Sequence, residues 1–156
     1  MTPCLRLSSP IGELLLTSDG TALTGIYMEP HPAIEGECPP DELLQSAAVQ
    51  LKEYFLGQRR AFDLPLRLEG TAFQQQVWKA LCEIPYGTTI SYAELARRIG
   101  NPKACRAVGL ANGRNPVGIV VPCHRVIGAN GTLTGYGGGL DRKEFLLDWE
   151  ARHISV

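Results

Sequence analysis

Residues 91–111 read SYAELARRIGNPKACRAVGLA, and this stretch decides the interpretation of the fold. The side chains of Ser91 and Glu94 fit a capping box, which predicts a short helix over Tyr92–Ile99. A Gly-Asn-Pro turn then leads into a second helical stretch from about Lys103 to Ala111. Two short helices joined by such a turn are typical of a helix-turn-helix, whose second helix is the recognition helix.

The charge around this stretch is uneven. Residues 1–70 carry five basic and ten acidic side chains, a net charge of −5, whereas residues 71–156 carry ten basic and six acidic ones, a net charge of +4. Residues 95–140 contain six basic side chains and no acidic one, with Lys103 and Arg106 on the predicted recognition helix. This pattern favours binding of a polyanion, although a solvated basic face and a helical hairpin used only for packing would look the same.

Composition excludes several other classes of protein. Hydrophobic residues make up 44% of the chain and charged residues 20%, which is enough apolar surface to form a core. No apolar stretch approaches the roughly 20 residues of a membrane helix. Arg6 and Ser8 interrupt the segment where a signal peptide would be apolar, so we expect neither secretion nor a membrane partner.

The five cysteines are odd in number and irregularly spaced, which fits a reducing compartment better than a disulfide framework. Cys4, His31, Cys38 and Cys82 lack the paired spacing of a zinc site, so we expect no metal. We expect the four cysteines other than Cys123 to be buried and inert.

The first third of the chain predicts short antiparallel strands followed by a helix. The expected strands are Cys4–Ser8, Leu14–Thr17 and Leu23–Met28, with a hairpin turn at Asp19-Gly20. Asp41 can cap the helix, which Gly57 would end. Its apolar face would consist of Leu44, Ala48, Leu51 and Phe55.

The rest of the chain predicts a second unit around the helix-turn-helix. A helix capped by Thr71 and Gln74 precedes it, and the apolar run Val117–Val121 predicts a buried strand. A glycine-rich loop or wing and a last helix follow. We expect Asp141 with Glu144 to cap that helix, which would bury Phe145, Leu146 and Trp149.

The predicted fold class is therefore α/β, in the α+β sense, with two domains. Residues 1–66 would form a small N-terminal support domain of antiparallel sheet plus helix, and residues 67–70 a linker. Residues 71–156 would form a winged helix-turn-helix-like domain that carries the active-site cysteine.

Cys123 is the candidate nucleophile. It follows the predicted buried strand and Pro122, and it precedes His124 and Arg125, whose positive charge would stabilise the reactive thiolate. On a strand, the side chains of Cys123 and His124 would point to opposite faces, so contact between them would need a bend or a bridging water. Glu150 on the last helix is a candidate to orient the His124 ring.

Several ordered motifs resemble those of the O6-alkylguanine-DNA alkyltransferases. The resemblance is strong from about Thr71 to Glu150 and weaker in the N-terminal unit, where Ser9–Gly12 and Leu14–Leu16 also fit. The matching motifs are Val121–Val126, Ser91-Tyr92, Leu95-Ala96, Asn101–Ala104, Arg106–Gly109, Asn115-Pro116 and Lys143-Glu144.

The resemblance implies direct reversal of DNA damage. The helix-turn-helix would bind double-stranded DNA containing alkylated guanine through its minor groove, and the damaged base would be flipped out. The alkyl group of O6-methylguanine would then move to Cys123, with O4-methylthymine an open second substrate. Because water does not cleave a thioether, each protein molecule would act once. The resemblance also implies that the protein acts as a monomer and needs no cofactor. The protein would act in the cytoplasm of a prokaryote, on the nucleoid, or in a eukaryotic nucleus.

The resemblance also implies roles for individual residues. His124 and Glu150 would activate Cys123 through a water, and Tyr92 would donate a proton toward guanine N3. Asn115 would hold the turn ahead of the active-site strand. Arg106 would fill the stack that the flipped base leaves. The other expected DNA-binding residues are Lys103, Ala107, Arg114 and Arg125, and the expected substrate-pocket residues are Val126, Tyr136, Gly137, Gly118 and Lys143.

Two positions differ from some members of that family. Gly137 follows Tyr136 where some members have a hydroxyl side chain, and Gly118 stands where some have proline. We therefore expect methyl adducts to be accepted and leave benzyl-sized adducts open. Three other functions stay open: a binder of alkylated bases that transfers nothing, a winged-helix regulator with a redox-sensitive cysteine, and a thiol hydrolase.

Overall fold

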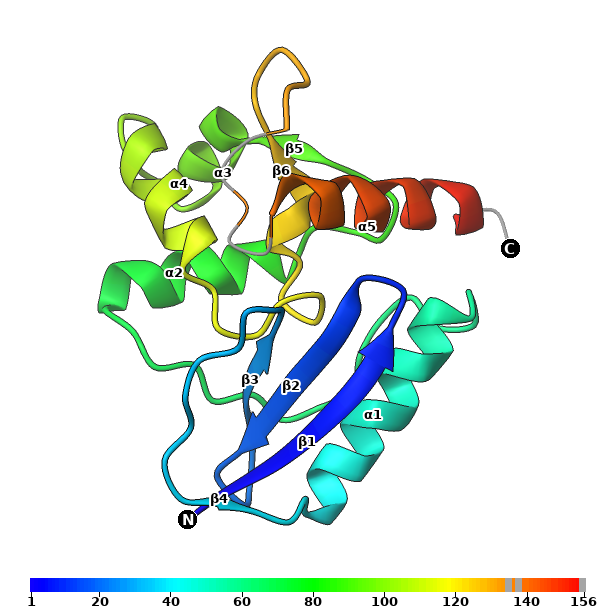
Figure 1. The fold of residues 1–156 in the computed structure, drawn as a ribbon. Coiled ribbons are helices and arrows are strands. Elements are labelled where there is room, and N and C mark those ends of the chain that lie inside the picture. The colour runs from blue at the N-terminus through cyan, green and yellow to red at the C-terminus, as the bar shows by residue number, and fades with distance from the viewer. Residues whose placement is uncertain (134–135, 137–138, 155–156) are drawn as a thin grey trace. The chain divides into compact units, whose positions relative to one another are not determined.

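The computed structural model describes residues 1–133, 136 and 139–154, and the chain divides into two compact units (Figure 1). The first unit comprises Met1–Glu69 together with Pro116–Gly118. The second comprises Gly70–Asn115 and Ile119–Val156. The Pro116–Gly118 segment thus groups with the N-terminal unit and not with its neighbours in the sequence.

The N-terminal unit contains a four-stranded sheet in the order β3-β2-β1-β4. Its strands are β1 (Thr2–Ser9), β2 (Gly12–Ser18), β3 (Leu23–Tyr27) and β4 (Glu37–Cys38). β2 pairs antiparallel with β1 and β3, as the sequence predicts, whereas the unexpected β4 pairs parallel with β1. The predicted turn is present, because Oδ1 of Asp19 accepts hydrogen bonds from the backbone N–H groups of Thr21 and Ala22.

Helix α1 (Glu42–Phe55) packs against β1 and β2. Asp41 caps it as predicted, accepting a hydrogen bond from the Leu44 N–H at 2.8 Å. The buried face includes Tyr54, whereas Phe55, which the sequence placed on that face, is half-buried. The apolar face is therefore rotated by one residue at the end of the helix.

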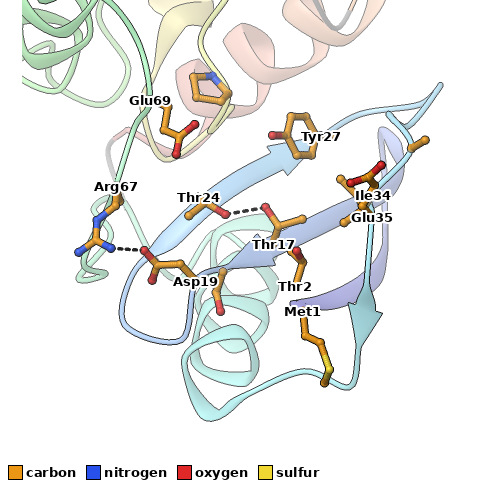
Figure 2. A pocket seen from close by; sticks show the side chains of 13 residues that line it. Met1, Thr2, Thr17, Asp19, Thr24, Tyr27, Ile34, Glu35, Arg67 and Glu69 are labelled. Atoms are coloured by element: carbon orange, nitrogen blue, oxygen red, sulfur yellow. Dashed lines mark hydrogen bonds and ion pairs between the residues drawn. The ribbon is translucent and has the colours of Figure 1, made fainter.

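A cavity of about 560 Å³ lies on the sheet of the N-terminal unit (Figure 2). Thr17 and Thr24 hydrogen-bond to each other at 2.8 Å across its floor, and Arg67 forms an ion pair with Asp19 at its edge. None of the residues that line this cavity is among the site residues predicted from the sequence.

The C-terminal unit contains four α-helices in its described part: α2 (Ala72–Leu81), α3 (Tyr92–Arg98), α4 (Cys105–Gly113) and α5 (Leu140–His153). The Thr71–Gln74 capping box of α2 is formed in full, and Ser91 caps α3 by accepting a hydrogen bond from the Glu94 N–H. β5 (Ile90–Ser91) and β6 (Val126–Ile127) form a parallel two-stranded sheet that the sequence did not predict.

Helices α3 and α4 form the helix-turn-helix, and both pack on α2. Trp78 of α2 is 1% exposed, and its Nε1 donates to the backbone carbonyl of Ala111 in α4 at 2.9 Å. The recognition helix begins at Cys105, later than predicted, because the residues after Pro102 continue the turn. Lys103 therefore lies in the turn and not on the helix.

The predicted strand Val117–Val121 is wrong. Only Val117 forms a bridge, with Ile26, and a turn follows in which Ile119 has a φ of +71°. Prolines at both ends of the run remove strand donors, and Gly118 permits the turn. A β-branched residue is unfavourable at positive φ, and burial of the Ile119 side chain offsets that cost.

Helix α5 begins differently from the prediction. Its N-cap is Gly139, which has a φ of +94° and provides no side-chain cap. Asp141 lies inside the first turn, where its negative charge interacts favourably with the helix dipole. The buried side chains of α5 are those of Lys143, Leu146 and Glu150. The predicted buried rings of Phe145 and Trp149 are half-buried and stack on each other. None of the helices in the described ranges is long and apolar enough to cross a membrane.

Candidate active site

Cys123, His124 and Arg125 form one turn of 3-10 helix and are all buried. The Cys123 N–H donates to the Val121 carbonyl at 2.8 Å, and the Arg125 N–H donates to the Pro122 carbonyl at 3.0 Å. This turn replaces the strand geometry expected from the sequence. The side chains of Cys123 and His124 therefore do not alternate between the two faces of a strand, contrary to the prediction from the sequence.

The Cys123 thiol is 6% exposed. Burial raises its pKa, and a hydrogen bond with Asn115 and the charge of Lys143 act in the opposite direction without cancelling that effect. The resting cysteine is therefore a neutral thiol, not the thiolate that the neighbouring charges suggested. A base has to remove its proton before it can react.

His124 and Glu150 form a buried pair, with 2.7 Å between Nε2 and Oε2. Burial lowers the pKa of His124 despite Glu150, so the imidazole is neutral. Burial alone would raise the pKa of Glu150, but its hydrogen bonds with His124 and Arg125 lower it far below its usual range. An ionised carboxylate only accepts, so Nε2 carries the imidazole proton. Nδ1 is left as a buried acceptor with no partner among the described residues.

Arg125 binds the same carboxylate through two hydrogen bonds. Its Nε lies 2.8 Å from Oε1 of Glu150 and its Nη2 lies 2.9 Å from Oε2, while Nη1 donates to the Ile84 carbonyl at 2.7 Å. Arg125 is 6% exposed. This burial counts against the prediction that Arg125 contacts DNA, because its guanidinium is already bound inside the protein.

Lys143 brings together two other predicted residues. Its Nζ donates to the Val126 carbonyl at 2.6 Å and lies 5.8 Å from the centre of the Tyr92 ring. Burial lowers the pKa of Lys143 to about 8, although the nearby Cys123 acts to raise it. A buried ammonium at this place favours ionisation of the thiol.

Two asparagines hold the carbonyl groups around Pro122. Nδ2 of Asn115 donates to the Val121 carbonyl at 2.8 Å, as expected for a residue that holds this turn. Nδ2 of Asn112 donates to the Cys123 carbonyl at 3.2 Å. Asn112 is not among the site residues predicted from the sequence. The signal in the sequence was the position of this polar residue directly after Ala111, at the end of the predicted helix.

A cavity of about 490 Å³ lies between α4 and the segment before α5. Tyr136, predicted to line the substrate pocket, lies on it, and burial and the nearby Cys123 raise the pKa of its hydroxyl far above the usual value. Gly137 lies outside the described residues, and Gly118 belongs to the N-terminal unit. The lining residues that the sequence analysis did not name as pocket residues are Gly109, Leu110, Gly113, Arg114, Gly139 and Leu140.

The outer face of α4 is exposed and carries no acidic side chain. Arg106, Ala107 and Leu110 lie on this face, with Leu110 63% exposed, and Arg114 follows the helix. Lys103 is exposed in the preceding turn.

The remaining cysteines differ from the prediction that all four are buried. Cys4 is buried and Cys38 is half-buried, but Cys82 and Cys105 are exposed. Across the described ranges, no group of three or more His, Cys, Asp or Glu side chains could hold a metal ion.

The fold and the site define a two-unit helix-turn-helix protein built around a buried cysteine with a histidine–glutamate pair. The DNA-binding domain of 6-O-methylguanine DNA methyltransferase matches residues 72–152, and the ribonuclease-like domain of the same family matches residues 6–68. The chain belongs to the 6-O-methylguanine DNA methyltransferase family.

Its relatives match over nearly their whole length. Proteins named methylated-DNA–protein-cysteine methyltransferase are 55% identical in Methanosarcina acetivorans, covering 91% of this chain and 94% of that protein, and 50% identical in Mycobacterium leprae, covering 99% and 95%. The structure of Mycobacterium tuberculosis OGT in complex with DNA has a TM-score of 0.90 and 52% identity, covering 95% of this chain and 92% of that one. The predicted α+β fold class is confirmed.

Proposed function

We propose that this protein repairs alkylated DNA by accepting the alkyl group of O6-methylguanine on Sγ of Cys123, once per molecule. The observation that carries the proposal is a buried thiol next to a neutral His124, whose Nδ1 is free to accept a proton while Glu150 holds Nε2. Relatives at 55% and 50% identity bear the name methylated-DNA–protein-cysteine methyltransferase, and the M. tuberculosis OGT neighbour is in complex with DNA.

The transfer is a displacement at the alkyl carbon. The Cys123 thiolate forms a new S–C bond while the C–O6 bond breaks and its electron pair leaves on guanine. Nδ1 of His124 takes the thiol proton through a bridging water, and Tyr92 gives a proton to guanine N3. Afterwards the His124 imidazolium loses its proton to solvent and the Tyr92 phenolate regains one, which restores both side chains to their neutral forms. Overall, one proton passes from the thiol to the base, so guanine leaves neutral. The thioether is not hydrolysed, which limits each molecule to one transfer.

Lys143 and Asn115 prepare the nucleophile. The hydrogen bond with Asn115 and the positive charge of Lys143 both oppose the effect of burial on the thiol. The Lys143 ammonium also fixes the Val126 carbonyl at one wall of the site. Both residues therefore favour the thiolate in a place where water cannot stabilise it.

DNA binds along the exposed face of α4, in the minor groove, with the protein acting as a monomer. Arg106 enters the stack that the flipped guanine leaves, and Lys103, Ala107 and Arg114 contact the strands beside it. Extruding a base costs a few kcal/mol, which the phosphate contacts and the inserted side chain offset. The cavity beside Tyr136 receives the base.

Intact-mass measurement after mixing with a duplex containing one O6-methylguanine tests the proposal. The protein should gain the mass of one methyl group, located on Cys123, and uptake should stop at one equivalent. Cys123→Ala should gain no mass but still bind the duplex. No mass gain by the wild type, or repeated turnover as in a thiol hydrolase, would refute the proposal.

A further inference from the structure

Asn112 makes a hydrogen bond that the chemistry described above does not use. It lies near the end of α4, is 1% exposed, and donates through Nδ2 to the backbone carbonyl of Cys123 at 3.2 Å. Its Oδ1 is also buried and has no hydrogen-bond partner in the described part of the chain. Asn112 therefore joins the helix that carries Arg106 directly to the residue that accepts the alkyl group.

The stability of the fold does not account for this amide. The hydrogen bond to the Cys123 carbonyl and the unpaired Oδ1 nearly cancel in stability, because leucine, of similar size, would remove one unpaired buried acceptor and leave another, the Cys123 carbonyl, in its place. The buried amide of Gln50 is different, because it donates to the Asp63 carbonyl at 3.0 Å and accepts from the Asp63 N–H at 2.9 Å. Gln50 satisfies both ends of its amide, whereas Asn112 satisfies only the end that faces Cys123.

Asn112 connects a fixed part of α4 to the Cys123 turn. The preceding residue, Ala111, is tied to α2 through the indole N–H of Trp78, so this end of α4 is fixed inside the unit. The opposite face of the same helix exposes Arg106 and Leu110. The hydrogen bond from Asn112 therefore holds the Cys123 carbonyl against the fixed end of the helix whose opposite face is exposed.

We propose that Asn112 is a positioning residue, whose amide couples the exposed face of α4 to the Cys123 turn and holds that turn where alkyl transfer requires it. The inference rests on the proposed alkyl transfer to Cys123 and adds to it a residue that touches neither the base nor the alkyl group. Small displacements of a reacting group from its productive position lower reaction rates strongly.

The test compares Asn112→Leu with Gln50→Leu in the full-length protein. Single-turnover transfer from a duplex containing O6-methylguanine should fall about 10- to 100-fold in Asn112→Leu. Its affinity for an unmodified duplex and its thermal midpoint should change little, because one unpaired buried acceptor replaces another. Gln50→Leu should show the reverse, a lower thermal midpoint with an unchanged transfer rate, because it breaks two satisfied hydrogen bonds far along the chain from Cys123.

Two further measurements separate positioning from simple loosening of the turn. Iodoacetamide labelling of Cys123, followed by peptide mapping, should stay as slow in Asn112→Leu as in the wild type, and faster labelling would mean that the turn has only become accessible. In Asn112→Asp, the transfer rate relative to wild type should rise as the pH is lowered, because a protonated carboxyl regains the donor. A ratio independent of pH would overturn the inference.

The outcomes also separate this inference from the proposed function. If the wild-type protein takes up no methyl group, the proposed function itself fails. If the wild type transfers and Asn112→Leu transfers equally fast, the proposed function stands and the role assigned to Asn112 is wrong.

Discussion

Replacing Arg125 with alanine tests the charge network behind Cys123. The substitution removes two hydrogen bonds to Glu150 and one to the Ile84 carbonyl, so the buried carboxylate loses the guanidinium charge that His124 and the long contact to the Gly87 N–H do not replace. Removing one partner of a buried ion pair costs about 3–5 kcal/mol. For a chain of this size, each kcal/mol lowers the thermal midpoint by about 2–4 °C, so we expect a fall of about 6–20 °C.

Tryptophan fluorescence reports the unfolding of the C-terminal unit, because both tryptophans, Trp78 and Trp149, belong to it. Arg106→Ala is the matched control, since it removes an exposed arginine and should leave the midpoint nearly unchanged. DNA binding separates the two variants a second time. Arg106→Ala should weaken binding of a duplex that contains O6-methylguanine, because no side chain then fills the stack that the flipped base leaves, and Arg125→Ala should not. If Arg125→Ala instead unfolds like the wild type and weakens duplex binding, its guanidinium serves DNA and the reasoning from the buried pair is wrong.

Three more predictions concern the same unit. Glu150→Gln should slow single-turnover transfer about 10²-fold or more, because the new amide donates to Nε2 of His124 and removes the acceptor at Nδ1; an unchanged rate would exclude His124 as the base. Trp78→Phe should lower the free energy of unfolding in urea, followed by Trp149 fluorescence, by about 1–3 kcal/mol, because the buried Ala111 carbonyl loses its donor. Burial lowers the folded-state pKa of Lys143 from 10.5 to about 8, so the unfolded chain binds more protons between these values and the contribution of Lys143 to stability rises with pH across that window. The free energy of unfolding of wild type minus that of Lys143→Met should increase accordingly, and a flat difference would contradict the shifted pKa.

The elements that the sequence predicted well are those fixed by local hydrogen bonds. The side chains of Asp41, Thr71 and Ser91 each accept a hydrogen bond from the backbone N–H three residues later. The start of each helix is therefore determined by four consecutive residues. The hairpin turn at Asp19 is local in the same way. Such signals need no knowledge of the tertiary structure.

The misplaced features depend on distant partners. Arg125 has the same charge as an arginine that binds DNA, and only its contact with Glu150, 25 residues away in the chain, shows that it is buried. The run Val117–Val121 has the composition of a strand, but the turn at Ile119 follows from tertiary burial. The partner of Asn112, Cys123, is likewise invisible in the local pattern. In these three cases the prediction from the sequence fails at or next to the candidate active site, where the local conformational preference of the residues differs from the structure that they adopt.

The Pro116–Gly118 segment has a consequence for dissecting the protein. Ile26 in β3 donates to the Pro116 carbonyl at 2.9 Å and accepts from the Gly118 N–H at 3.4 Å, so the chain visits the N-terminal unit between α4 and Cys123. A fragment that begins at Gly70 would keep every residue of the proposed chemistry, yet it would leave these backbone groups without partners five residues before the nucleophile. The end of the first unit at Glu69 is therefore not a point at which the chain can be divided without unpairing backbone groups close to the proposed nucleophile.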